Sequence, residues 1–94
     1  MSTAHGFTAA RADCYSAELA RQGARMNRAY EAVVATRSGG LKRRLQQAQA
    51  AWSKRRDSEC QDDASAGAAD VLHEGSCRLD ATIQRAAQLE RMAG

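Results

Sequence analysis

The sequence has no proline and very few aromatic residues. Its 94 residues include one tryptophan, two tyrosines and one phenylalanine. Proline interrupts helices, and runs of aromatic and β-branched residues are typical of strands, so both absences favour helix. Alanine and arginine, which are good helix formers, are abundant instead. We therefore predict an all-α fold in a single domain of residues 1–94. A small three-helix bundle is the favoured arrangement, with a four-helix bundle as the alternative.

Long apolar runs are also absent. No segment approaches the roughly 18 apolar residues needed to cross a membrane, so we expect no membrane span. Residues 1–6 lack the apolar region of a signal peptide. The chain is therefore either cytoplasmic or a mature exported region with a new initiator methionine. We expect residues 1–7 to be flexible.

Residues that bind metals or perform catalysis do not occur at suitable spacings. The three cysteines, Cys14, Cys60 and Cys77, form no C-x-x-C pair, and the two histidines, His5 and His73, are far apart. There is no nucleophile elbow and no glycine-rich phosphate loop. We therefore expect no enzyme activity, no metal and no cofactor.

Apolar residues recur at steps of three and four, which predicts three helices, at about 8–36, 41–62 and 68–92. Ser38-Gly39-Gly40 should stop the first helix, because glycine readily adopts the left-handed C-cap conformation. The predicted inward positions are Tyr15, Leu19, Gln22, Met26, Tyr30 and Val33 in the first helix, Leu41, Leu45, Ala48, Trp52 and Arg56 in the second, and Leu72, Leu79, Ile83, Ala86 and Leu89 in the third.

Charges are segregated along the chain. Residues 33–56 hold seven basic residues and no acid, whereas residues 57–74 hold six acids and no lysine or arginine. In a helical hairpin the second segment forms one acidic end, which we call the acidic tip (residues 57–74). It is either an ordinary solvated surface or a partner-binding patch. The basic segment has no interleaved aromatics and the net charge is only +3, so we expect no nucleic-acid binding. The candidate partner-binding residues are Asp62, Asp63, Asp70 and Glu74.

Trp52 and Arg56 are four residues apart, so the guanidinium can lie against the indole on one helix face. Arg56 belongs to an otherwise apolar stripe and needs a partner, because an unpaired buried charge is costly. Asp57 points about 100° away on the same helix, so we expect that partner from another part of the fold. Arg56 is either a ligand-binding residue or part of a packing network, and we favour the network. The residues assigned to this network are Asn27, Tyr30, Gln49, Trp52, Arg56, Asp57, Thr82 and Arg85.

Cys60 and Cys77 flank the turn between the second and third predicted helices. A disulfide there would pin a helical hairpin and stabilise it by roughly 3 kcal/mol; the alternative is two buried free thiols. Cys77 lies nearly opposite Leu79 and Ile83 on an ideal helix. The bond therefore needs either a bend near Gly75 or a third helix that is contacted on two sides.

Three blocks of residues have the composition and spacing of a known family. The chain resembles the lysozyme-inhibitor LprI-type domain, a family of small secreted bacterial proteins, over about residues 14–90. The middle block is the most specific of the three. Cys14, Met26-Asn27 and Tyr30 fit the first block; Leu45, Gln49, Trp52, Arg56-Asp57 and Cys60 fit the second; Cys77, Thr82, Arg85 and Leu89 fit the third.

The resemblance implies a non-enzymatic, helical, periplasmic or secreted protein that inhibits a lysozyme or another cell-wall hydrolase. Such a compartment permits the Cys60–Cys77 disulfide. Family members commonly carry a cysteine upstream of the Cys14 position, and this chain has none. Cys14 is therefore free, intermolecular or deprived of its partner. The alternative function is a structural or assembly module of the envelope, homodimeric through Cys14.

Electrostatics bears on how such an inhibitor would bind. The chain has a pI of about 9.1, and typical animal lysozymes are also basic, so overall charge disfavours association. A locally acidic patch can offset this repulsion. The acidic tip is such a patch, and its carboxylates can meet arginines around a muramidase cleft.

Overall fold

The computed structural model describes residues 3–61 and 68–94, with side chains at 13–61 and 73–94. The chain forms three helices, α1 (Thr3–Ala35), α2 (Gly39–Glu59) and α3 (Ala68–Ala93), and the described residues contain no strand. The predicted all-α, three-helix architecture is confirmed. The helices of the described residues include none that is both long and apolar enough to span a membrane.

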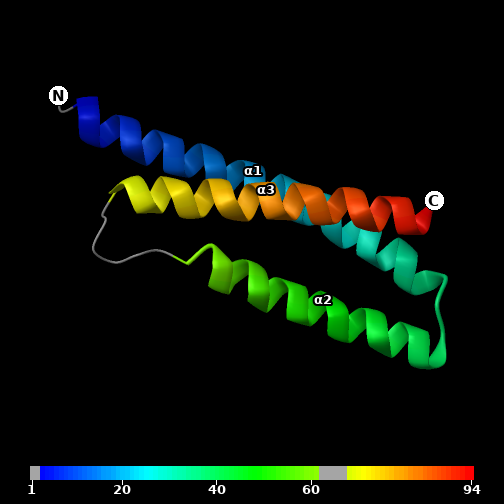
Figure 1. The fold of residues 1–94 in the computed structure, drawn as a ribbon. Coiled ribbons are helices and arrows are strands. Elements are labelled where there is room, and N and C mark those ends of the chain that lie inside the picture. The colour runs from blue at the N-terminus through cyan, green and yellow to red at the C-terminus, as the bar shows by residue number, and fades with distance from the viewer. Residues whose placement is uncertain (1–2, 62–67) are drawn as a thin grey trace.

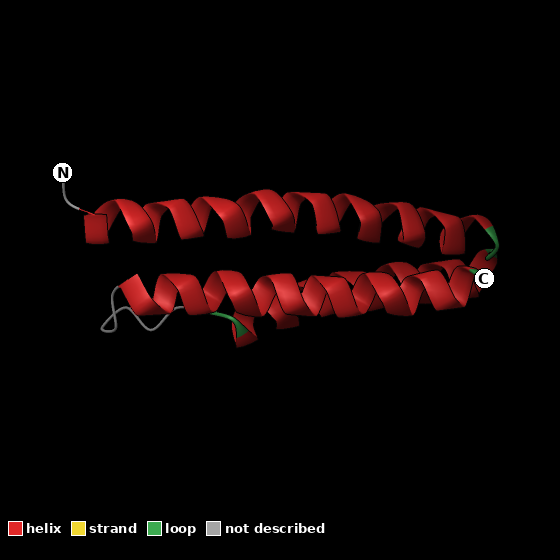
Figure 2. Ribbon diagram, turned by 90° about the horizontal axis from the view of Figure 1, so that it is seen from above, coloured by secondary structure: helices red, strands yellow, loops and turns green. Residues whose placement is uncertain are grey.

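The helices form an elongated molecule of 57 × 23 × 14 Å. α1 and α3 run in the same direction, and α2, which lies between them in the sequence, runs in the opposite direction (Figure 1). Viewed from above, α1 and α3 extend along the length of the molecule as a parallel pair (Figure 2). α2 lies against one side of this pair, and its close packing with the other helices is much more limited.

The helix boundaries differ from the prediction at the ends. Residues 3–7, which we expected to precede the first helix, belong to α1. Gly39 has φ +57° and is the first residue of α2, so its left-handed conformation serves the start of α2 and does not cap α1. α1 ends at Ala35 instead, where the hydroxyl of Thr36 donates a hydrogen bond to the carbonyl of Val33 (2.8 Å).

The core is small and comes mainly from α1 and α3. Five of the predicted inward residues are buried there, and Ala29 joins them. In α2, which is described throughout, Leu45 is the only buried residue. Tyr30, Val34, Trp52 and Ala93 pack against this core from its edge. The buried cluster consists of Met26, Ala29 and Val33 from α1, Leu45 from α2, and Ala86 and Leu89 from α3.

Two predicted inward positions of α2 are wrong. Leu41 is 59% exposed and Ala48 is also exposed. The inward face is instead centred on Leu45, Gln49 and Trp52, which leaves Ala48 to one side. Leu41 lies in the first turn of α2, before the residue with which that helix enters the core. The apolar residues of α2 predicted the wrong inward face, because the true inward face contains a polar residue, Gln49.

Gly75 lies at a close contact between α3 and α1. A Cβ on Gly75 would lie 3.2 Å from the Cβ of Tyr15, so only glycine fits without displacing a neighbour. α3 continues through Gly75 without interruption. Of the two geometries considered for Cys77, a third helix contacted on two sides is therefore the one that occurs: Gly75 faces α1 while Cys77 bonds to Cys60 at the end of α2.

Candidate functional site

The predicted disulfide is present at one end of the bundle. Cys60 and Cys77 are bonded, with their Cα atoms 5.5 Å apart, and the bond links the end of α2 to α3. Cys60 is only 2% exposed, and its backbone N–H donates to the carbonyl of Arg56 at 2.9 Å, which closes the last turn of α2. Cys14 is exposed on α1 and forms no disulfide. The covalent bond therefore fixes the C-terminal end of α2 to α3.

Trp52 is in contact with two arginines from different helices. The guanidinium carbon of Arg56 is 5.1 Å from the indole centroid, and that of Arg85 is 5.9 Å away. Both distances are within cation–π range. The Nε of Arg85 also donates to the Oε1 of Gln49 (2.9 Å), and the Nε2 of Gln49 approaches the Sδ of Met26 (3.6 Å). This chain of contacts connects α3 to α2 and α2 to α1 through polar groups.

Arg56 has partners both on its own helix and across the interface. Its Nη2 lies 3.0 Å from the carboxylate of Asp57, and its Nη1 donates to the hydroxyl of Thr82 at 3.2 Å. Thr82 is fully buried, and its hydroxyl donates to the carbonyl of Arg78 (2.7 Å). The expected partner from another part of the fold is therefore Thr82, on α3. The adjacent Asp57, which we did not expect to be a partner, also pairs with Arg56, because a long, flexible arginine side chain can turn back toward its neighbour.

Six of the eight residues assigned to the packing network are therefore in contact. They are joined by hydrogen bonds, ion pairs or cation–π contacts, as described above. Tyr30 is partly buried and packs on the apolar core, whereas Asn27 is exposed on α1 and lies outside the network. The six are Gln49, Trp52, Arg56, Asp57, Thr82 and Arg85.

The acidic tip is only partly described. Asp62, Asp63 and the side chain of Asp70 lie outside the described residues. Glu74 is described: its side chain is 18% exposed and its Oε1 lies 2.6 Å from the Nη2 of Arg78. The partner-binding role of the tip stays a prediction, and Glu74 already has an arginine partner within the chain.

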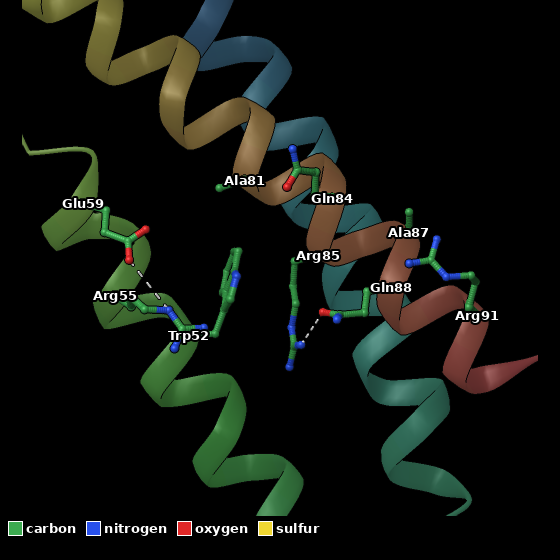
Figure 3. A pocket seen from close by; sticks show the side chains of 9 residues that line it. All are labelled: Trp52, Arg55, Glu59, Ala81, Gln84, Arg85, Ala87, Gln88 and Arg91. Atoms are coloured by element: carbon green, nitrogen blue, oxygen red, sulfur yellow. Dashed lines mark hydrogen bonds and ion pairs between the residues drawn. The ribbon is translucent and has the colours of Figure 1, made fainter.

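A groove between α2 and α3 was not predicted from the sequence. It has a volume of about 580 Å³, and Trp52 and Arg85 project into it from opposite helices (Figure 3). We call this the α2–α3 groove. The residues that line the groove are mostly polar and exposed, so no apolar pattern in the sequence indicates them. The lining residues of α3 do lie on one face of that helix. The lining residues are Trp52, Arg55 and Glu59 from α2, and Ala81, Gln84, Arg85, Ala87, Gln88 and Arg91 from α3.

Positive charge dominates the α2–α3 groove. Arg55, Arg85 and Arg91 line it, against the single carboxylate of Glu59. Glu59 is only at the limit of ion-pair distance from Arg55 (4.0 Å), with both side chains about two-thirds exposed. Burial, and then the positive charge of Arg55, lower the pKa of Arg85. Among the described side chains, no carboxylate lies within ion-pair distance of Arg85 or Arg91.

A separate ion pair joins α1 to α3 away from this groove. Arg25 donates to both carboxylate oxygens of Glu90, at 2.8 and 2.6 Å. The hydrogen bonds from Arg25 hold the pKa of Glu90 below its ordinary value. Within the described residues, no group of three histidine, cysteine or acidic side chains is placed to hold a metal ion. The polar side chains named above therefore join the helices or line the positively charged α2–α3 groove.

Comparison with protein families gives one match over nearly the whole chain. The model of the family described as "Lysozyme inhibitor LprI" matches residues 2–89. Comparison with curated proteins and with solved structures finds no match.

Proposed function

Because the chain belongs to the LprI lysozyme-inhibitor family, we propose that it is a non-enzymatic protein of the periplasm or cell exterior that binds and inhibits a lysozyme-type cell-wall hydrolase. The observation that carries this proposal is the extent of the family match, residues 2–89 of 94. The Cys60–Cys77 disulfide supports the location, because such bonds persist in oxidising compartments.

The proposed mechanism is steric and electrostatic blocking of the hydrolase cleft. The three helices and the disulfide supply a fixed scaffold, and the acidic tip supplies the local negative charge that a basic hydrolase requires. Glu74 is paired with Arg78, so within the tip the proposed contact relies chiefly on Asp62, Asp63 and Asp70.

The test is to neutralise these three aspartates together and measure inhibition of a panel of muramidases. A matched control removes three acids from exposed positions elsewhere, as Asp13→Asn, Glu31→Gln and Asp80→Asn. We expect the first variant to lose inhibition and the control to keep it. Unchanged inhibition in the tip variant, with helicity intact by circular dichroism, would exclude the tip as the contact. If the unaltered chain inhibits no muramidase of the panel, the proposed function itself is wrong.

A structural or assembly role in the envelope is the competing hypothesis. The exposed thiol of Cys14 is the observation that favours it, because an exposed cysteine in an oxidising compartment can join two chains. Non-reducing electrophoresis of the protein and of its Cys14→Ser variant tests this directly. A dimer that disappears in the variant, together with no inhibition, would support the assembly role over the inhibitory one.

A further inference from the structure

The α2–α3 groove has an excess of positive charge that the described fold does not neutralise. Its lining carries three guanidinium groups and one carboxylate. Arg85 is held in place by neutral amides, those of Gln49 (2.9 Å) and Gln88 (2.7 Å), and by the indole of Trp52. A partly buried cation whose contacts are all neutral, with a second arginine close enough to lower its pKa, attracts an external anion.

The arrangement of the groove selects among anions. Guanidinium groups pair with carboxylates through parallel hydrogen bonds. The groove is also lined by Ala81 and Ala87, which offer apolar contact, and by the amide of Gln84, which can pair with a peptide group. Two arginines of this chain already lie over the indole, 5.1 and 5.9 Å from its centroid, and would compete with a sugar or base for stacking on the ring. The combination fits a polypeptide that bears carboxylates better than a glycan or a nucleic acid.

We propose that the α2–α3 groove is a binding site for an acidic segment of a partner protein, whose carboxylates pair with Arg55, Arg85 and Arg91. The site is distinct from the acidic tip and of opposite charge. This binding is additional to the inhibitory function. The groove recognises the carboxylates of a segment, so any protein that carries such a segment can bind there.

The only tryptophan of the chain lines this groove, so its fluorescence reports occupancy directly. The experiment titrates the protein with a hexaglutamate peptide and follows Trp52 emission, with a hexaglutamine peptide and a short single-stranded DNA as comparison ligands. We expect a saturable change with hexaglutamate alone. An equal response to DNA at the same ionic strength would show a general anion site and overturn the proposal, as would no response to hexaglutamate.

Variants locate the binding. Arg55→Gln with Arg91→Gln removes two exposed guanidiniums of the groove and spares Arg85, which holds the helices together. Arg43→Gln with Arg44→Gln removes the same charge from exposed positions near the start of α2. We expect hexaglutamate to bind about tenfold more weakly to the first variant, as the loss of two exposed charge pairs predicts, and normally to the second. Equal weakening in both would overturn the proposal.

Two further measurements concern the fold of the variants and the oligomeric state of the protein. If both variants melt near the melting temperature of the unaltered protein, the groove variant is folded. If the groove variant is not folded, Arg91→Gln alone replaces it in the titration.

Light scattering of the free protein tests whether a second copy fills the groove. A dimer that the groove variant dissociates would overturn the proposal. Muramidase inhibition is measured separately, and peptide binding without inhibition leaves this site standing while the proposed function fails.

Discussion

The α1/α3 pair and α2 are held in the molecule by different forces. α1 and α3 share five of the six residues of the buried cluster and approach closely at Gly75. α2 contributes Leu45 alone and depends on the disulfide and on the contacts of Trp52 and Gln49. A domain of this size buries little apolar surface, so it cannot supply a full apolar interface for every helix. The remaining helix, α2, is therefore attached by covalent and polar means.

The largest effect should come from the core of the α1/α3 pair. Leu89 is completely buried in α3, and Leu89→Ala should reduce the free energy of unfolding by about 4 kcal/mol through lost burial and the cavity left behind. Leu41→Ala is the control, because Leu41 is 59% exposed, and it should change stability by less than about 0.5 kcal/mol. Urea denaturation measures both. Similar values for the two variants would show that the buried cluster does not dominate stability.

Removing the disulfide should come next and should act mainly on α2. In a Cys14→Ala background, Cys60→Ala with Cys77→Ala should cost about 3 kcal/mol, because the open chain gains freedom when unfolded. Hydrogen exchange should then accelerate in α2 more than in α1 and α3, since α2 loses its strongest attachment. Uniform acceleration in all three helices would show that α2 is not separately attached.

Trp52→Ala should cost about 2 kcal/mol, less than a fully buried tryptophan, because Trp52 is only partly buried at the edge of the core. Much of the loss should be coupled to Arg85, whose guanidinium lies over the ring. A double-mutant cycle with Arg85→Gln measures this coupling in denaturant. Strict additivity would mean that the cation–π contact contributes nothing to the attachment of α2.

The smallest effect is a pH dependence within the α1/α3 pair. The pKa of Glu90 is lowered in the folded chain below its ordinary 4.5, so its stabilisation is present above about pH 4.5 and lost as pH falls through the folded value. Glu90→Gln should therefore be less stable than the unaltered chain at pH 7, and the difference should shrink below pH 4.5. The control is Glu31→Gln, at an exposed position. A difference that is independent of pH would contradict the role of the Arg25–Glu90 pair.

The sequence predicted the features that depend on helical periodicity. Met26, Val33, Ala86 and Leu89 recur at helical spacing and are buried, and the Cys60–Cys77 disulfide joins the predicted hairpin. Periodicity failed in α2, where Leu41 is exposed. That helix is mostly polar, so a stripe of apolar residues does not define its inward face.

The polar features were predictable only in part. The spacing of Trp52 and Arg56 predicts their contact, because both lie on one helix. The contacts of Arg85 with Trp52 and Gln49 cross between helices, and their geometry depends on how α2 lies against α3. The α2–α3 groove depends on the same placement, which no pattern within a single helix contains.

The disulfide also has a kinetic consequence for α2. This helix is joined to α1 by the short connection at residues 36–38 and to α3 by Cys60–Cys77, so it is tethered at both ends. If the contacts of Trp52 and Gln49 open, α2 cannot diffuse away, and its effective concentration near α3 stays high. We therefore expect any opening of α2 to be a local event that does not require global unfolding.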